Sequence, residues 1–257
     1  MRPLEGRRIL VTREKSASLR VRLEAQGATV VEVPTIQIAP PSDPAPLQAA
    51  LARVGTFSWI AFTSGNAVEA VGDALQGPLP RIGIASVGPS TSTRILQVFG
   101  RGADLEPRSA FKAEGLLAAF AEHGLAGGES VLLPVSDRAR LVLREGLERL
   151  GARVESVVAY RTLIPEGLRE ALAAALATPF DLVVLASPSA VEGFCRARDP
   201  GSAPVAVLGP VTAEAASSAG LDVRLVAQPP TLEGLVQGIV QVLGPHTGGG
   251  AEGRAHS

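Results

Sequence analysis

The stretch FSWIAFTSGNAVEAV at residues 57–71 decides the fold, because FDLVVLASPSAVEGF at residues 180–194 repeats it. Each copy opens with consecutive bulky apolar residues, which is typical of a strand covered on both faces of a sheet. A short polar segment follows, and the AVE of each copy begins a pattern with helical spacing. A buried strand that leads into a helix is the building block of a parallel sheet, so the sequence predicts an α/β fold.

Other segments of the chain also recur. The matched pairs are SVGPSTS (86–92) with VLGPVTA (207–213), FKAEGLLAAF (111–120) with PTLEGLVQGI (230–239), and residues 6–33 with residues 127–157. The last pair is a short unit of two predicted strands, and the remaining segments make a long unit of three. Short and long units alternate along the chain, which predicts two doubly wound parallel sheets of five strands each.

The repeats leave open which short unit joins which long unit. Contiguous pairing would combine neighbours in the sequence. Crossed pairing would take the chain between the domains twice, at TIQIAPPSDP (35–44) and at YRTLIPEG (160–167), where prolines end a strand. The Gly-rich tail GPHTGGGAEGRAHS (244–257) predicts disorder.

Composition narrows the range of functions. The chain has 257 residues, is 46% hydrophobic and 19% charged, and carries a formal net charge of −1. This is the profile of a soluble globular protein without the field that would recruit nucleic acid or a membrane surface. One cysteine, Cys195, and three histidines without metal-ligand spacing predict neither a disulfide nor a metal site. The N-terminus lacks a signal-peptide pattern, so we expect a cytoplasmic protein.

Polar residues follow the predicted strands, at the edge where ligands of doubly wound sheets bind. These strand ends are FTSGN (62–66), SVGPST (86–91), PVSDR (134–138), LASPS (185–189) and LGPVT (208–212). We predict Ser64, Ser136 and Ser187 as helix N-caps, and Pro89, Pro188 and Pro210 in first helical turns. Such ends attract carboxylates and phosphates, which predicts an anion-binding cleft, although each could serve capping alone. No glycine-rich nucleotide motif is present, so no dinucleotide or nucleoside triphosphate cofactor is expected.

Other polar residues allow two interpretations each. Arg13 and Arg138 follow equivalent strands and could pair with ligand carboxylates or be solvated surface charges. Asp137 is interpreted as an acid in the first turn of a helix rather than as a catalytic base. Trp59 and Cys195 are expected to be structural core residues.

The chain resembles the uroporphyrinogen-III synthase family. The resemblance rests on FTSGNAVEA, SVGPST, the AYRT that holds Tyr160, ASPSAV, LGPVTAEAA and PPTLEGL, in that order between about residues 7 and 243. It implies crossed pairing of two flavodoxin-like domains joined by a two-stranded connector, with the active-site cleft between them. The implied bounds are 1–36 plus 166–244 for domain 1, 40–162 for domain 2, 37–39 and 163–165 for the connectors, and 245–257 for a disordered tail.

The resemblance also implies an activity. The family closes the linear tetrapyrrole hydroxymethylbilane to uroporphyrinogen III, with loss of water and inversion of ring D through a spiro intermediate, without metal or cofactor. It implies a monomer that meets the preceding enzyme of the pathway only transiently. A cytoplasmic two-domain binding module for a small carboxylated or phosphorylated ligand is the alternative.

Tyr160, the only tyrosine of the chain, is the family-equivalent candidate for the proton donor to the departing hydroxyl. The expected substrate-binding residues lie at the strand ends and in the loops before helices. They are Arg13, Ser64, Gly65, Asn66, Gly88, Thr91, Ser136, Arg138, Ser187, Pro188, Ser189, Gly209, Thr212 and Thr231.

Overall fold

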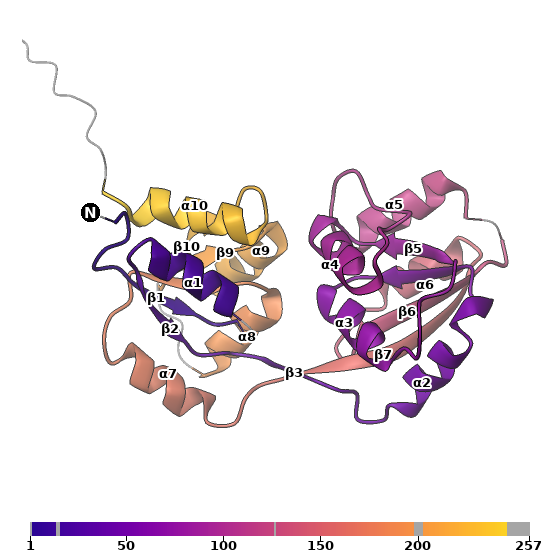
Figure 1. The fold of residues 1–257 in the computed structure, drawn as a ribbon, viewed down its shortest axis with the longest axis horizontal. Helices are drawn as coiled ribbons and strands as arrows, with labels where there is room; N and C mark the ends of the chain where they lie inside the picture. The colour runs from indigo at the N-terminus through magenta and orange to yellow at the C-terminus, as the bar shows by residue number, and fades with distance from the viewer. Residues whose placement is uncertain (1, 14–15, 126, 198–202, 246–257) are drawn as a thin grey trace, which may run out of the picture. The chain divides into compact units, whose positions relative to one another are not determined.

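The chain divides into two compact units, each with its own five-stranded sheet. The computed structural model describes residues 2–13, 16–125, 127–197 and 203–245, which leaves residues 246–257 of the expected tail outside the described residues (Figure 1). Unit 1 comprises the described residues up to Gln37 and from Ile164 onward, and unit 2 runs from Ile38 to Leu163. The divisions fall inside segments 37–39 and 163–165.

Unit 1 has the strand order of a flavodoxin-like fold. Its elements are β1 (Arg8–Val11), α1 (Ala17–Ala25), β2 (Thr29–Glu32), α7 (Leu168–Leu176), β8 (Leu182–Leu185), α8 (Pro188–Ala197), β9 (Pro204–Val207), α9 (Pro210–Ser218), β10 (Asp222–Val226) and α10 (Leu232–Leu243). The sheet order is β10-β9-β8-β1-β2, and its neighbouring strands run parallel. With the strands renumbered along the unit, this is the flavodoxin order 2-1-3-4-5 read from the other edge.

Unit 2 places its strands in the order β3-β7-β6-β4-β5. Its elements are β3 (Gln37–Ala39), α2 (Ala45–Ala52), the short 3₁₀ helix η1 (Val54–Thr56), β4 (Trp59–Phe62), α3 (Gly65–Ala74), β5 (Gly83–Ser86), α4 (Pro89–Phe99), α5 (Ala113–His123), β6 (Ser130–Ser136), α6 (Val142–Arg149) and β7 (Arg153–Leu163). Strands β4–β7 pair in parallel. The α/β class with parallel sheets, predicted from the sequence, is therefore confirmed.

The sheets combine repeat units that are not neighbours in the sequence. Strands β1 and β2, from the first short unit, share a sheet with β8, β9 and β10 of the second long unit. Strands β6 and β7, from the second short unit, share a sheet with β4 and β5 of the first long unit. The chain therefore leaves unit 1 after β2 and returns to it after β7.

The prediction of three strands from each long unit is wrong for the first copy. Its third strand is reduced to an isolated bridge between Ala85 and Leu105, whereas the second copy forms the full strand β10. Pro107 follows two residues after Leu105 and has no N–H to continue the ladder. The fifth place in the unit 2 sheet is taken by β3, on the opposite edge beside β7.

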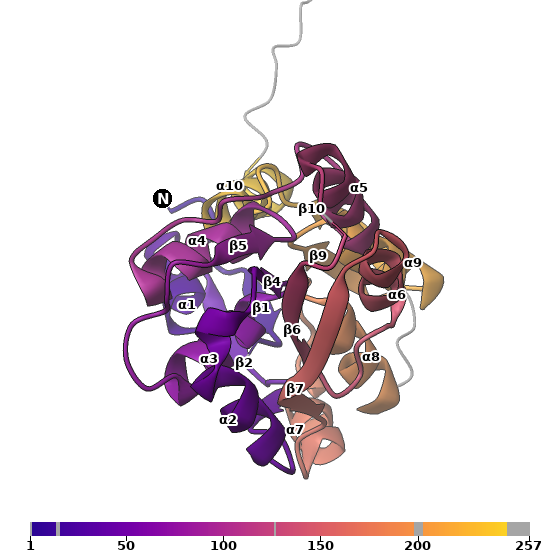
Figure 2. The same cartoon turned by 90° about the vertical axis from the view of Figure 1, so that its right-hand side faces the viewer.

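Both faces of each central strand are buried, which explains why the apolar runs do not alternate. In β4, Ile60 and Phe62 belong to one hydrophobic core, and Trp59 and Ala61 belong to another across the sheet. Figure 2 shows α2 and α3 on one side of this sheet and α5 and α6 on the other. Trp59 packs edge-on against Phe120 at 5.4 Å between ring centroids, in the structural role expected of it.

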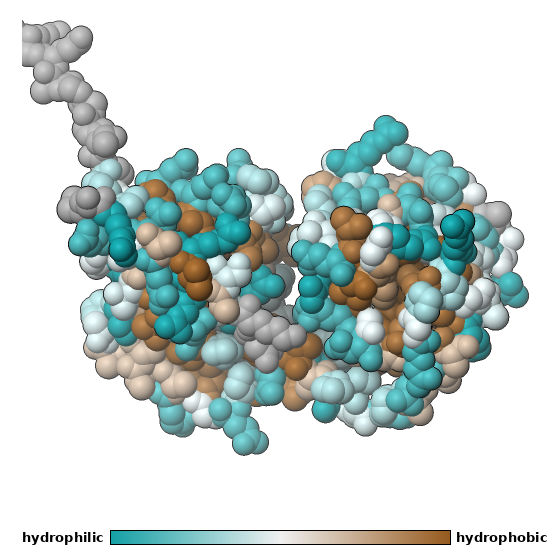
Figure 3. Space-filling view, viewed as in Figure 1, coloured by the Kyte–Doolittle hydropathy of each residue, from teal (hydrophilic) through white to brown (hydrophobic). Residues whose placement is uncertain are grey.

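None of the described helices is long and apolar enough to cross a bilayer. The face seen in Figure 3 intersperses hydrophilic and hydrophobic residues on each unit.

A repeated glycine lets the loop before the last helix of each long unit fold back on that helix. A Cβ on Gly115 would lie 2.0 Å from the carbonyl oxygen of Ala110, and one on Gly234 would lie 2.2 Å from that of Pro229. Real Cβ atoms do not approach so closely, so each site requires glycine. The shared Glu-Gly of FKAEGL and PTLEGL thus has a packing reason.

Gly193 of α8 plays a similar part where the chain leaves unit 1. Thr35, just beyond β2, is fully buried and donates its hydroxyl to the carbonyl of Ala190 at 3.0 Å. A Cβ on Gly193 would lie 2.2 Å from the carbonyl oxygen of Thr35.

We expect Gly193→Ala to destabilise unit 1 by about 1–3 kcal/mol, because overpacking against backbone outweighs the gain in helix propensity. Gly146→Ala in α6 is the matched control, since its added methyl meets the side-chain end of Leu117, which can move. Differential scanning calorimetry of both variants measures the difference. A Gly193→Ala protein as stable as its parent would contradict the close approach.

Candidate active site

The carboxyl ends of the unit 2 strands carry a cap and a tight turn. Ser64 follows β4 and caps α3, its Oγ accepting the amide N–H of Ala67 at 3.2 Å. Gly88 follows β5 and precedes Pro89, the first residue of α4. Ser86 Oγ donates to the Gly88 carbonyl at 2.9 Å and accepts the Gly88 amide at 3.2 Å. Because the strands are parallel, these groups belong to the same edge of the sheet.

Unit 1 repeats the arrangement at its own strand ends. Ser187 follows β8 and its Oγ accepts the amide N–H of Ala190 at 3.2 Å, with Pro188 as the first residue of α8. Gly209 follows β9 and precedes Pro210 of α9. Thr231 caps α10 by accepting the Gly234 amide at 3.1 Å. The predictions for Ser64 and Ser187 as caps, and for the three prolines in first turns, are confirmed.

Tyr160 reaches this edge of unit 2 through a β-bulge in β7. Val135 of β6 pairs with Val158, but Ser136 pairs with Tyr160, so Ala159 is the extra residue. Side chains of a regular strand alternate between faces, and an extra residue reverses the alternation beyond it. Tyr160 therefore joins the same core as Val157 and Ala159.

The Tyr160 side chain is buried, and its hydroxyl contacts Ser64. The residue is 8% exposed, and its phenol oxygen lies 3.0 Å from Ser64 Oγ. Its backbone carbonyl accepts the amide of Asp137 at 3.1 Å, which ties the strand to the turn after β6. The single tyrosine thus links β7 to the N-terminus of α3.

Two predictions at the end of β6 are wrong. Ser136 does not cap a helix: it ends β6, and its Oγ accepts the Arg138 amide at 3.3 Å within a turn. Helix α6 begins only at Val142, because the turn occupies the intervening residues, and Leu141 precedes it without a side-chain cap. Asp137 is therefore not a first-turn acid, and its Oδ1 instead accepts the amide of Thr162 at 3.1 Å.

The other expected binding residues differ in accessibility. Thr91 and Thr212 occupy equivalent positions in α4 and α9 and are both buried, at 6% and 5% exposed. The first turns of α3 and α8 are partly or fully exposed at Gly65, Asn66, Pro188 and Ser189. Arg13 is exposed after β1, and Arg138 is exposed after β6.

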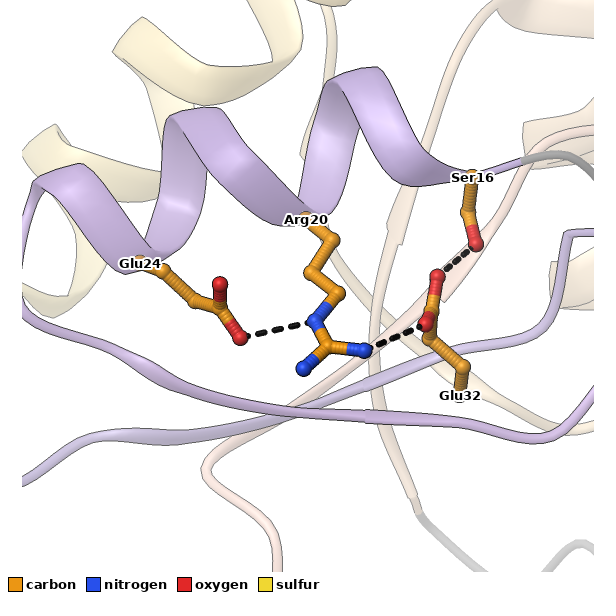
Figure 4. A network of polar contacts seen from close by, with 4 residues as sticks. All are labelled: Ser16, Arg20, Glu24 and Glu32. Carbon is orange, nitrogen blue, oxygen red and sulfur yellow. Dashed lines mark hydrogen bonds and ion pairs between the residues drawn. The ribbon is translucent and has the colours of Figure 1, made fainter.

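A polar network that sequence reasoning missed fixes α1 to the end of β2 (Figure 4). Ser16 precedes α1 but donates its hydroxyl to Glu32 rather than capping the helix. Arg20 pairs with Glu24 at 2.8 Å and with Glu32 at 3.1 Å. Hydrogen bonds to Glu24, and then to Glu32, raise the pKa of the Arg20 guanidinium. Only the Arg20–Glu24 spacing was a signal in the sequence.

The described residues contain no cluster of three or more His, Cys, Asp or Glu that could hold a metal ion. What the strand ends offer instead is a set of hydrogen-bonding groups: capped helix N-termini, hydroxyls, arginines and one phenol. The fold and these ends define an α/β protein with parallel sheets and polar strand ends.

Comparison with known proteins names the family. A family model described as uroporphyrinogen-III synthase HemD matches residues 17–237. The uroporphyrinogen-III synthase of Synechococcus elongatus is 34% identical over 93% of this chain and 96% of its own length. The chloroplastic uroporphyrinogen-III synthase of Oryza sativa is 30% identical over 93% of this chain and 81% of its own. The chain belongs to the uroporphyrinogen-III synthase family.

Solved structures agree on the fold. A mutant uroporphyrinogen III synthase from the extremely thermophilic bacterium Thermus thermophilus matches with a TM-score of 0.66 at 18% identity, over 93% of this chain and 99% of that one. The uroporphyrinogen-III synthetase of Helicobacter pylori matches with a TM-score of 0.57 at 15% identity, over 90% and 97% of the two chains.

Cys195, the single cysteine, packs against the core of unit 1, and burial raises the pKa of its thiol. Because the thiolate is the reactive form, we expect iodoacetamide to modify native protein at neutral pH several-fold more slowly than a free thiol, and the rate to rise as the pH is raised. Mass spectrometry of the alkylated protein measures the rate, with urea-unfolded protein as the control. Equal rates in the two states would show that Cys195 is not shielded.

Proposed function

We propose that this chain catalyses the closure of hydroxymethylbilane to uroporphyrinogen III, with loss of water and inversion of ring D. The observation that carries the proposal is the identity to named synthases across nearly the whole chain. It favours an enzyme over a binding module, because the similarity includes the strand ends of both units. We propose that it works as a cytoplasmic monomer that meets the preceding pathway enzyme transiently.

The chemistry of the substrate suits the strand ends. The linear tetrapyrrole carries eight carboxylates, while the protein has a formal net charge of −1, so attraction has to be local. Helix N-termini provide amides and a positive dipole end for such arms. We propose that carboxylate arms of the substrate bind Ser64 to Asn66, Gly88 and Arg138 at the strand ends of unit 2, and Arg13, Ser187 to Ser189, Gly209 and Thr231 at those of unit 1.

The reaction requires mainly the correct orientation of the substrate and one proton for the departing hydroxyl. A pyrrole nitrogen expels the hydroxyl as water and leaves an azafulvene cation, which the substituted position of ring D attacks to give the spiro intermediate. The original bond from that position to its methylene bridge then breaks, and the bridge bonds to the unsubstituted α-position of ring D, which loses its proton as the macrocycle closes. Holding the chain bent so that this position attacks is a matter of orientation. Tyr160 donates a proton to the departing hydroxyl, and its phenolate regains one when ring closure releases a proton.

Product analysis tests the activity. We expect freshly prepared hydroxymethylbilane to give the type III isomer with the enzyme, resolved by chromatography after oxidation to uroporphyrin. Boiled protein is the control, since the uncatalysed reaction gives the uninverted isomer. Formation of isomer I alone, at the uncatalysed rate, would refute the proposal, and tight carboxylate binding without turnover would favour a binding module.

Removing only the hydroxyl of Tyr160 tests the proton donor. We expect Tyr160→Phe to lower kcat by roughly 10²-fold with a small change in KM, because general acid catalysis contributes about that much. Trp59→Phe is the aromatic control in the opposite core of the same sheet, where a loss of stability rather than of kcat is expected. An unchanged kcat in Tyr160→Phe would reduce the residue to packing.

Charge removal at the strand ends tests substrate binding. We expect Arg13→Gln and Arg138→Gln each to raise KM about tenfold, which corresponds to about 1.4 kcal/mol and is typical of a hydrogen bond to a charged group. Arg22→Gln on α1, whose ion pair with Glu233 lies on the surface, is the control. Steady-state kinetics at two salt concentrations decide the matter, since solvated arginines would leave KM at the parent value.

A further inference from the structure

Ser64 touches two different groups through one oxygen atom. Its Oγ accepts the amide N–H of Ala67 at 3.2 Å, as a helix cap does, and it lies 3.0 Å from the phenol oxygen of Tyr160. Either hydroxyl could donate in the second contact. The direction of this hydrogen bond matters, because a phenol that donates its proton to Ser64 cannot donate it to another group.

Hydrogen-bond accounting allows Ser64 to be the donor. A serine hydroxyl has one proton and two lone pairs, and the Ala67 amide already occupies one lone pair. Among the described residues, Ser64 Oγ is the hydrogen-bond partner recorded for the phenol. If Ser64 donates, the amide, the serine and the tyrosine form a chain in which each member donates to the next, and such chains strengthen cooperatively.

We propose that Ser64 is the positioning residue of Tyr160: it donates its hydroxyl proton to the phenol oxygen, which leaves the phenol proton directed to the departing hydroxyl of the substrate. This inference rests on the proposed function of Tyr160 as proton donor. As the phenol gives up its proton, the negative charge on its oxygen strengthens the hydrogen bond from Ser64. The N-terminus of α3, which Ser64 caps, contributes a positive dipole end at the same place.

The surrounding structure fixes the positions of Ser64 and Tyr160 relative to each other. The bulge at Ala159 turns Tyr160 toward the core that contains Ala67 and Val68 of α3. Burial of the ring restricts its rotamers, so the hydroxyl is held at the start of the helix. Ser64 therefore acts through Tyr160 and needs no contact of its own with the reacting atoms.

The duplication of the chain supplies a matched control. Ser187 is the counterpart of Ser64 and caps α8 by the same contact at the same distance of 3.2 Å. The residue aligned with Tyr160 in the first short unit is Ile36, which has no hydroxyl. Ser187 thus performs the capping role without the tyrosine.

Tyr160 is the only tyrosine, so protein labelled with ¹³C at the tyrosine ring carbon bearing the hydroxyl gives one resonance that reports this residue alone. We expect Ser64→Ala to shift this resonance at neutral pH in the direction expected when a phenol oxygen loses a hydrogen-bond donor. Ser187→Ala should lose a similar amount of stability and leave the resonance in place. The charged groups on the elements around the phenol, Asp137, Arg161 and Glu69, are the same in both variants.

The direction of the resonance shift decides the proposal. A shift in the opposite direction would show that the phenol is the donor, and an unmoved resonance would show that the contact does not matter; either outcome overturns the proposal.

Measurements of kcat test whether the contact between Ser64 and Tyr160 affects turnover. We expect Ser64→Ala to lower kcat about tenfold, as the loss of one hydrogen bond predicts, and Ser64→Thr to restore most of it. In the Tyr160→Phe background, Ser64→Ala should cost no further kcat, since the group through which it acts is gone. Additive losses in this double-mutant cycle overturn the positioning role. If Tyr160→Phe alone keeps its kcat, the proposed acid fails, while the ¹³C resonance of the parent and of Ser64→Ala still decides the direction of the Ser64 hydrogen bond.

Discussion

The pairing of β7 with β6 is the constraint on which unit 2 depends. All seven residues of β6 have a partner in β7, and β6 in turn pairs with β4, the strand that leads to α3. The bulge near the end of this ladder sets the side to which the last residues of β7 point. A regular ladder would direct Tyr160 away from α3, into the core on the other face of the sheet. The position of the phenol is therefore a consequence of backbone pairing, and Ser64 reinforces it.

Much of the fold could be predicted because the duplicated sequence contains local signals that agree with each other. Buried strands show as unbroken apolar runs, and Ser64 and Ser187 stand one residue before helical patterns. The unpredicted features depend on backbone details that side-chain patterns do not encode. The bulge at Ala159 is one, and the turn that delays α6 and makes Asp137 a partner of Thr162 is another. The loss of the third strand near Leu105 had a signal in Pro107, but the repeat argued against it.

The two units share most features of the repeat but differ at the end of one strand. Both keep a serine cap after the equivalent strand, a Gly-Pro helix start and a glycine that admits a folded-back loop. They differ where the second strand of each short unit ends: one copy continues through Ile36, and the other bulges and presents Tyr160. The shared features are those that stabilise a helix N-terminus, and the differing one places a phenol beside Ser64.

The reduced third strand has a bearing on how the protein behaves in concentrated solution. Its bridge closes the outer edge of β5: Ile84 donates its amide to the Asp104 carboxylate, the Ile84 carbonyl accepts from Leu105, and Ser86 donates to the Leu105 carbonyl. An open strand edge invites the edge of another molecule to add to it. Here a carboxylate and a segment that ends at a proline occupy the β5 edge, so this edge offers no template for another strand.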